Sequence, residues 1–259
     1  MTEPKRPVAL VTGGRRGIGL GIVRALVTSG YDVAFTGVSD PSSETDGIIA
    51  ELGRCGAKSA YFKSDIADLA GHADVVSGII SQFGGIDCLV NNAGIASVVR
   101  GDFLGLLPEN FDKIINTNLR GTVFFTQEII RAMQGMEPSK VARSIITITS
   151  VSATMSSPER MDYCITKAAL AAFSQSLAVR LAPENIGVFE VRPGIIRTDM
   201  TAGVTGKYDA LIAGGLVPAK RWGEASDIGS VVASLASGAF GFATGSVLNV
   251  DGALSISRL

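Results

Sequence analysis

Residues 7–19 read PVALVTGGRRGIG. The apolar run at 7–11 has the length of a buried strand, and a helical pattern continues from the glycines to about residue 30. Gly13, Gly17 and Gly19 lack a Cβ atom, so a pyrophosphate can approach the backbone, and the following helix N-terminus offers it unpaired N–H groups. This order of strand, glycine turn and helix predicts a dinucleotide site. The spacing differs from Gly-x-Gly-x-x-Gly, and a tight turn without a ligand is the alternative.

The end of the second expected strand, at 33–37, indicates which dinucleotide is bound. Proteins that prefer NAD place an acid there to hold the ribose 2′-hydroxyl, whereas this chain has Ser39, with Asp40 following as an acid that could still reach. Arg15 and Arg16 of the glycine turn can each form a charge-assisted bond to a 2′-phosphate, worth about 1.5 to 3 kcal/mol. The sequence therefore favours NADP(H), and NAD(H) stays open.

Strand-length apolar runs alternate with helical patterns along the rest of the chain, which predicts a parallel sheet with right-handed crossovers. Further strands are expected at residues 59–63, 86–90, 145–149, 188–191 and 245–250. Helices are expected at residues 43–54, 69–83, 108–133, 162–181 and 227–237. The chain of 259 residues shows no linker or repeat, so we expect one α/β domain over residues 1–259, a doubly wound parallel sheet with helices on both faces.

Composition and charge argue against several classes of protein. Hydrophobic residues make up 46% and charged residues 18% of the chain, which is typical of a globular protein with a well-buried sheet. With 23 basic and 24 acidic side chains, no nonspecific attraction to nucleic acid or to an anionic membrane is expected. No apolar run is long enough to span a membrane and no secretory signal precedes the first strand, so we expect a cytoplasmic protein. The cysteines are scattered, and the single histidine, His72, has no partner with which to bind a metal.

Residues 150–167 read SVSATMSSPERMDYCITK and form the expected chemical centre. Tyr163 and Lys167 stand four positions apart in an expected helix, which places the phenol and the ammonium on one face. A tyrosine titrates near pH ~10 and a neighbouring opposite charge lowers its pKa by about 1 to 3 units, so Lys167 can make Tyr163 a proton carrier at neutral pH. Ser150 ends the strand at 145–149, at the sheet edge where parallel sheets bind ligands. Taken alone, the pair could be a solvated helix face.

Other polar and small residues are expected at the same sheet edge. Asp65 follows the third strand and is either an acceptor for an adenine amino group or a cap for the next helix. Ala93 and Gly94 let a flat ring approach the backbone, and the Asn92 amide can hold strand ends together. In the expected helix at 108–133, asparagines and a glycine within residues 116–121 predict a bend or a packing demand.

These motifs together resemble those of the short-chain dehydrogenase/reductase family. They are Thr12-Gly-x-x-x-Gly-x-Gly19, Asn91-Asn-Ala-Gly94, Asn118, Ser150, Tyr163-x-x-x-Lys167 and Arg192-Pro-Gly194 through Thr198. The resemblance extends from Val8 to Gly252 and implies a Rossmann-like sheet of seven parallel strands in the order 3-2-1-4-5-6-7. It also implies a catalytic tetrad of Asn118, Ser150, Tyr163 and Lys167.

The resemblance implies an oxidoreductase that interconverts a carbonyl and a secondary alcohol. Tyr163 would pass a proton to or from the substrate oxygen, Ser150 would hold that oxygen, and Lys167 would bond the nicotinamide ribose. Asn118 would hold a water that links Lys167 to solvent. Residues 193–198 would meet the carboxamide and the phosphates, although they could otherwise simply end a strand. The expected cofactor-binding residues are Gly13, Arg15, Arg16, Gly17, Ile18, Gly19, Ser39, Asp65, Ile66, Asn92, Ala93, Gly94, Tyr163, Lys167, Pro193, Gly194, Ile196 and Thr198.

The substrate is less well defined than the chemistry. Residues 200–220 carry small side chains and few strong anchors, which predicts a mobile lid. The motif pattern is nearest to 3-oxoacyl-carrier-protein reductases, but residues 182–185, APEN, place an acid where carrier-protein-dependent relatives tend to have a base. A sugar, polyol or small ketone is therefore a rival substrate. The resemblance also implies a homotetramer, and a nucleotide-sensing protein without turnover remains as the alternative from another functional class.

Overall fold

The computed structural model describes residues 6–136, 141–203 and 205–258. Seven strands form one sheet in the order β3-β2-β1-β4-β5-β6-β7, and all neighbouring strands are parallel. The doubly wound, Rossmann-like fold expected from the sequence is therefore confirmed. The strands are β1 (Val8–Val11), β2 (Asp32–Gly37), β3 (Ser59–Lys63), β4 (Cys88–Asn91), β5 (Arg143–Ile148), β6 (Ile186–Pro193) and β7 (Val247–Val250).

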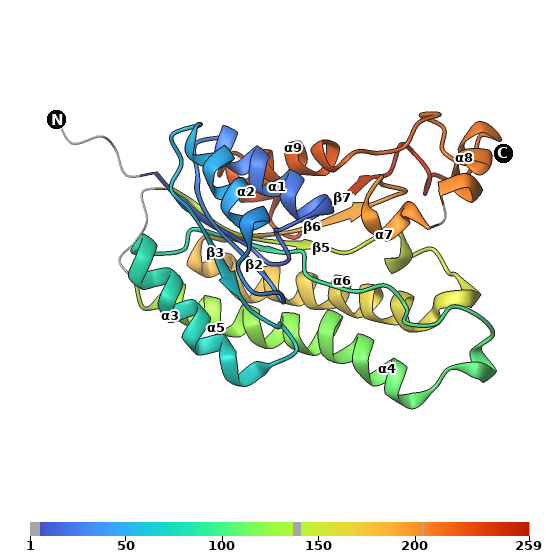
Figure 1. Ribbon diagram of the computed structural model, residues 1–259, viewed down its shortest axis with the longest axis horizontal. Helices are drawn as coiled ribbons and strands as arrows, with labels where there is room; N and C mark the ends of the chain where they lie inside the picture. Colours follow the sequence, from blue (N-terminus) through green and yellow to red (C-terminus); the bar gives the residue numbers. More distant parts are fainter. Residues whose placement is uncertain (1–5, 137–140, 204, 259) are drawn as a thin grey trace.

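Helices cover both faces of the sheet (Figure 1). One face carries α1 (Gly17–Thr28), α2 (Ser43–Gly53) and α9 (Ala225–Ala236). The other carries α3 (His72–Phe83), α4 (Pro108–Ile114), α5 (Thr122–Gln134) and α6 (Met161–Leu181). The chain order reverses between β1 and β4, and sheets of this kind bind ligands at the carboxyl ends of the strands beside such a reversal.

Alternate residues of each strand divide the core between the two faces. In β1, Ala9 and Val11 pack with the helices of the first face, whereas Val8 and Leu10 pack with those of the second. Because both faces are covered, the strands read as continuous apolar runs rather than as alternating patterns. Burying a side chain such as Leu10 completely is worth about 1.5 to 3 kcal/mol.

The expected single helix at 108–133 is interrupted. Between α4 and α5 lies a π-helical segment, Ile115–Gly121, a local widening of the helix that occurs often at functional sites. Gly121 meets a packing demand in this segment, because a Cβ atom there would lie 2.1 Å from the carbonyl oxygen of Ile66. Nε2 of the buried His72 lies 2.9 Å from the same oxygen. The predicted packing demand is confirmed, and the helix expected at 108–133 is divided at this point into α4, the π-helical segment and α5.

The expected lid at 200–220 contains more anchors than the sequence suggested. It holds α8 (Thr205–Ala213), preceded by the short α7 (Asp199–Ala202). Ile212 and Val217 are buried against Trp222, whose Nε1 donates a hydrogen bond to Asp209 at 2.7 Å. The expectation of few anchors is therefore wrong, because apolar side chains of α8 and of the residues after it pack against the indole of Trp222. The mobility of the lid stays a prediction, and its residue 204 lies outside the described residues.

Within the described ranges, no helix has both the length and the apolar character needed to span a lipid bilayer. Residues 1–5, on which the expected absence of a secretory signal partly rests, and residue 259 lie outside the part of the chain that the structure describes.

Candidate active site

The glycine turn between β1 and α1 adopts a conformation that requires glycine at two positions. Gly13 and Gly17 have φ angles of 65° and 54°, in the left-handed region. Arg16 precedes α1 without capping it through its side chain, and no acid lies in the first turn of the helix. A Cβ atom on Gly17 would lie 3.5 Å from Cγ2 of Thr198. The N–H groups that begin α1 are therefore placed to receive an anion beside Thr198.

Gly19 packs closely against the glycine turn. A Cβ atom there would lie 2.2 Å from the Gly13 carbonyl oxygen and 2.6 Å from Nδ2 of Asn92. Glycine is thus needed at this position for α1 to pack against the turn, and its expected role beside a pyrophosphate stays a prediction. The same Asn92 amide donates to the carbonyl oxygens of Thr12 and Gly13, at 2.9 and 3.1 Å. As predicted, Asn92 ties the end of β4 to the end of β1.

Charged side chains beyond the end of β2 pair with one another. Nη1 of Arg15 lies 3.6 Å from Oε2 of Glu44, and Nζ of Lys63 lies 2.7 Å from Oδ1 of Asp40. Asp40, the acid that follows Ser39, is therefore engaged by Lys63. Arg15 keeps a partner that is itself well exposed, so an anionic ligand can compete for its guanidinium.

Other expected residues at the adenosine end are fixed by local bonds. Asp65 accepts a hydrogen bond from the backbone N–H of Ala67 at 2.9 Å, but the next helical residues are Leu69–Gly71 and their N-cap is Asp68. The interpretation of Asp65 as a helix cap is therefore wrong, and its contact with an adenine amino group stays a prediction. The Tyr61 hydroxyl donates to the Ser39 carbonyl oxygen at 2.6 Å, and burial raises the pKa of this tyrosine. Ser39 is thereby held beside β3.

Asn118 is completely buried and binds the loop that follows β4. Its Oδ1 accepts from the backbone N–H of Ile95 at 2.7 Å, and its Nδ2 donates to the Ile95 carbonyl oxygen at 2.9 Å and to Oγ1 of Thr166 at 3.3 Å. A Cβ atom on Gly94 would lie 3.2 Å from Oδ1 of Asn118 and 3.8 Å from Nζ of Lys167. Asn118, Gly94 and Lys167 therefore meet at one point. The water expected between Asn118 and Lys167 stays a prediction.

The start of α6 places Tyr163 and Lys167 side by side, as predicted. Nζ of Lys167 lies 5.6 Å from the centroid of the Tyr163 ring and donates to the Ile148 carbonyl oxygen at 3.1 Å. Ser150 follows β5, and its hydroxyl acts to lower the pKa of the Tyr163 phenol. Its Oγ also accepts from the backbone N–H of Ser152 at 3.0 Å. A phenol, a hydroxyl and an ammonium thus share the carboxyl edge of the sheet.

The pKa of Tyr163 differs from the one expected from the sequence. Burial raises the pKa of Tyr163 above its usual 10.0, whereas the hydrogen bond with Ser150 and the positive charges of Arg160 and Arg100 act to lower it. Burial also lowers the pKa of Lys167 to about 8, so this ammonium is itself desolvated. The expectation that Lys167 gives the phenol a lowered pKa is therefore wrong for this structure, because burial leaves the Tyr163 pKa above its usual value.

A buried ion pair in β6 acts on Lys167. Oε1 of Glu190 accepts from Nε of Arg192 at 2.7 Å and from Oγ1 of Thr149 at 2.6 Å. The Lys167 pKa is lowered chiefly by burial, and the negative charge of Glu190 acts in the opposite direction. Sequence reasoning did not single out Glu190. A charged residue within an apolar strand is the signal that could have found it.

The turn after β6 does more than end a strand. Pro193 is the last residue of β6, and a Cβ atom on Gly194 would lie 2.7 Å from Cα of Asp251. Glycine is therefore required there by packing against the end of β7. Ile196 forms an isolated parallel bridge with Gly223, and Thr198 begins α7 with a capping box.

Asp162 is a further residue that sequence reasoning missed. It is only 2% exposed, and its Oδ1 accepts from Oγ of Ser97 at 2.6 Å and from the backbone N–H of Tyr163 at 2.8 Å. The bond to Ser97 ties the loop after β4 to the start of α6. An acid in the first turn of a helix is the signal that could have indicated it.

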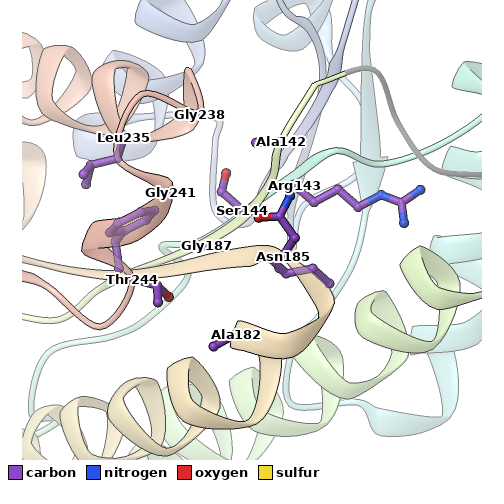
Figure 2. A pocket seen from close by; sticks show the side chains of 12 residues that line it. Ala142, Arg143, Ser144, Ala182, Asn185, Gly187, Leu235, Gly238, Gly241 and Thr244 are labelled. Atoms are coloured by element: carbon purple, nitrogen blue, oxygen red, sulfur yellow. The ribbon is translucent and has the colours of Figure 1, made fainter.

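A cavity at the opposite edge of the sheet is not part of this site. It lies at the N-terminal ends of β5 and β6 and is lined in part by Arg143, Ser144, Asn185 and Gly187 (Figure 2). Its volume of about 40 Å³ has room for a few water molecules but not for an organic substrate.

The site residues gather at the ends of three neighbouring strands. The glycine turn follows β1, Gly94 follows β4 and Ser150 follows β5. The uncapped start of α1 and the close approach allowed at Gly17 and Gly94 fit a dinucleotide. The phenol of Tyr163 lies at the same edge, beside Lys167. This arrangement of the fold and the site defines the class of protein, a dinucleotide-dependent oxidoreductase.

Comparisons with known proteins agree with this class. The sequence model described as Enoyl-(Acyl carrier protein) reductase matches residues 13–255. The 3-oxoacyl-[acyl-carrier-protein] reductase of Haemophilus influenzae is 38% identical over 251 residues, which cover 96% of this chain and 98% of that protein. The Escherichia coli reductase of the same name is 37% identical over 248 residues, covering 95% and 96%.

A solved structure is closer still. The 3-oxoacyl-[acyl-carrier protein] reductase from Brucella melitensis in complex with NAD has a TM-score of 0.96 and 61% sequence identity. The match covers 99% of this chain and 100% of that chain. The chain belongs to the short-chain dehydrogenase/reductase family, as its motifs predicted.

Proposed function

We propose that the chain is an NADP(H)-preferring reductase that converts a carbonyl to a secondary alcohol, with 3-oxoacyl thioesters as the first substrate class. Asn118, Ser150, Tyr163 and Lys167 are the proposed catalytic residues. The observation that carries the proposal is the position of Tyr163. Its side chain bonds Ser150, and Nζ of Lys167 lies 5.6 Å from its ring centroid, at the sheet edge where the glycine turn also opens.

Each proposed catalytic residue has a distinct task. When bound, the nucleotide supplies the hydride for reduction or accepts it in the reverse direction. Tyr163 gives its proton to the substrate oxygen and recovers it in oxidation, and Ser150 holds that oxygen beside the phenol. Lys167, with a pKa of about 8, remains mostly protonated at neutral pH, so its charge favours the phenolate that proton transfer leaves. Asn118 holds Ile95 and with it the loop next to Gly94.

The proposed cofactor site follows the same sheet edge. The start of α1 and Thr198 meet the phosphates, the backbone at Gly94 and Ile196 meets the nicotinamide, and Arg15 meets a 2′-phosphate beside Ser39. The engagement of Asp40 by Lys63 supports NADP(H) over NAD(H), because it leaves the end of β2 without a free acid for a ribose hydroxyl. NAD(H) is the second cofactor to test, since the Brucella relative was solved with NAD.

The substrate proposal rests on the names of the relatives and on one observation about residues 182–185. Glu184, the acid that argued against a carrier protein, accepts from Nε2 of Gln134 at 2.7 Å and pairs with Arg180. These partners offset its negative charge, so it is a weak argument against an acidic carrier. A sugar, polyol or small ketone remains the rival class.

The proposal includes a homotetramer in the cytoplasm. Apolar side chains on the outer surfaces of two long helices support an oligomer: Phe124 of α5 is 41% exposed, and Ile165 and Val179 of α6 are 48% and 79% exposed. Light scattering coupled to size-exclusion chromatography would measure the mass of the assembly, and a monomer at micromolar concentration would rule out the tetramer.

Fluorescence titration and a spectrophotometric assay test the function. NADPH and NADH are titrated separately, and oxidation of each is then followed at 340 nm with 3-oxoacyl thioesters, ketones and oxidised sugars. We expect tighter binding of NADPH and turnover of at least one carbonyl class. Tighter binding of NADH would contradict the cofactor assignment, and no turnover with any carbonyl would contradict the enzyme assignment.

A further inference from the structure

Two arginines from different loops act on the pKa of Tyr163. Arg160 immediately precedes α6, is partly buried, and has its guanidinium carbon 5.5 Å from the centroid of the Tyr163 ring. Arg100 belongs to the loop after β4. The two loops are joined, because the backbone N–H of Gly101 donates to the Glu159 carbonyl oxygen at 3.1 Å. Arg100 and Arg160 are thus carried on adjoining segments.

Neither guanidinium is neutralised by an acid of the described residues. Other arginines of the chain, Arg24 and Arg221 for example, have carboxylate oxygens at 2.7 Å. Among the residues described, no Asp or Glu oxygen lies within 4.0 Å of the charged nitrogens of Arg100 or Arg160.

Two neighbouring acids bind other groups through one carboxylate oxygen each, and Oδ2 of the buried Asp162 has no hydrogen-bond partner among the described residues. Asp162 accepts from Ser97 at 2.6 Å and from the Tyr163 N–H, while Asp102 accepts from the Leu104 N–H at 2.8 Å. The two positive charges at the phenol are therefore left for a group that comes from outside the chain.

The positive charges of both arginines act on the phenol of Tyr163. Although burial raises the pKa of Tyr163, the charges of Arg160 and Arg100 act to lower it. Cations that influence the phenol in this way also attract an anion next to the substrate oxygen. A planar guanidinium binds a carboxylate or a phosphate through two parallel hydrogen bonds, and more strongly when the site is partly buried.

We propose that Arg100 and Arg160 form a subsite for an anionic group, a carboxylate or a phosphate, located a few bonds from the carbonyl that the enzyme reduces. The inference rests on the proposed function, because the subsite adjoins the same Tyr163. The subsite favours short oxo acids and phosphorylated ketones as substrates. The corresponding hydroxy acids and phosphorylated alcohols are the products. In a neutral 3-oxoacyl thioester the groups next to the reacting carbonyl carry no such charge.

Matched pairs of substrates test the subsite. Oxo acids of four to six carbons are compared with their methyl esters, and hydroxyacetone phosphate with hydroxyacetone, each with NADPH at 340 nm. A 3-oxoacyl thioester is included as a neutral reference. We expect kcat/KM to be at least tenfold higher for the charged member of one pair. Preference within the acid pair identifies a carboxylate, and preference within the ketone pair a phosphate.

Variants connect the preference to the two residues. Arg160→Gln and Arg100→Gln should each lower the ratio of kcat/KM for the charged substrate to kcat/KM for its neutral partner by at least tenfold, mostly through KM of the charged substrate. Arg160→Lys should recover part of the preference because it keeps the charge. Arg120→Gln is the matched control, because the Arg120 guanidinium lies 5.7 Å from the Phe124 ring centroid in a similar stacking arrangement. NADPH titration checks that the cofactor site of each variant is intact.

The outcomes separate this inference from the proposed function. If the methyl esters and hydroxyacetone are reduced as well as their charged partners, or the charge preference survives both Gln variants, the subsite is disproved and the oxidoreductase stands. If no carbonyl compound of any charge is turned over, the proposed function fails and the subsite fails with it.

Discussion

Asn118 holds the backbone of Ile95 from both sides: Oδ1 accepts from the Ile95 N–H at 2.7 Å and Nδ2 donates to its carbonyl oxygen at 2.9 Å. The asparagine lies in the π-helical segment between α4 and α5, so a local irregularity of that helix determines the position of the loop after β4. This loop carries Gly94, which faces Lys167. The contact therefore connects the helix layer to the proposed nicotinamide site.

Replacement of Asn118 should affect both stability and turnover. Asn118→Ala leaves the backbone groups of Ile95 without their partner, which costs about 1 to 3 kcal/mol when the groups are buried. Urea unfolding and steady-state turnover measure the two effects. Asn116→Ala is the control, since Asn116 is exposed in the same π-helical segment and its loss should change the unfolding free energy by less than about 0.5 kcal/mol. Equal effects of the two replacements would contradict the anchoring role.

Tyr163→Phe removes the proposed proton donor and keeps the ring. Turnover should fall at least about a hundredfold, because general acid catalysis contributes roughly 10² to 10⁴, while NADPH binding stays normal. Tyr31→Phe provides a control: its hydroxyl donates to the Ala236 carbonyl oxygen at 2.5 Å, away from the site. That variant should lose about 1 kcal/mol of stability and keep its turnover. A Tyr163→Phe enzyme with unchanged kcat would rule out the acid role.

Lys167 should give the folded protein a characteristic pH dependence. Burial lowers the pKa of Lys167 from 10.5 to about 8, so between these values the unfolded chain keeps a proton that the folded chain releases. Below pH 8 the buried charge of Lys167 reduces the free energy of unfolding. Between about pH 8 and pH 10.5 this free energy therefore rises with pH. The unfolding free energies of the wild type and of Lys167→Met are measured at pH 7.5, 8.5 and 9.5. As the pH rises, the wild type should become more stable relative to the variant. A pH-independent difference would show that the lysine is not desolvated.

Gly19→Ala should destabilise the chain even when no nucleotide is added. The new Cβ atom would lie 2.2 Å from the Gly13 carbonyl oxygen, and overpacking of this kind costs about 1 to 3 kcal/mol. Gly47→Ala in α2 has no heavy atom within 4 Å of its Cβ position and should instead stabilise the helix by up to about 1 kcal/mol. Thermal unfolding of both variants gives the comparison, and a neutral Gly19→Ala would refute the packing role.

The Arg15–Glu44 ion pair predicts opposite effects of two substitutions on cofactor affinity. Arg15→Ala should weaken NADPH binding about tenfold to a hundredfold and leave NADH binding nearly unchanged, because only NADPH carries a 2′-phosphate. Glu44→Gln should tighten NADPH binding by removing the competing carboxylate. Fluorescence titration of both cofactors measures these affinities. Parallel losses for NADPH and NADH in Arg15→Ala would show that Arg15 does not distinguish them.

The sequence by itself determined the fold, the family and the identity of the Tyr163–Lys167 pair. Strand and helix periodicities are local, and the helical spacing brings a tyrosine and a lysine together without any knowledge of the rest of the chain. The strand order came from the family resemblance, and the sheet has that order.

Only the tertiary structure decided which distant side chains meet at the phenol. Ser97 and Asp162 are separated by 65 positions, and Arg100 and Arg160 reach Tyr163 from separate loops. Their contacts depend on how loops that follow β4 and β5 pack at one sheet edge, which no local pattern encodes. The same holds for the pKa values of Tyr163 and Lys167: the sequence gives the charges, but burial depends on the whole fold, and here it outweighs them.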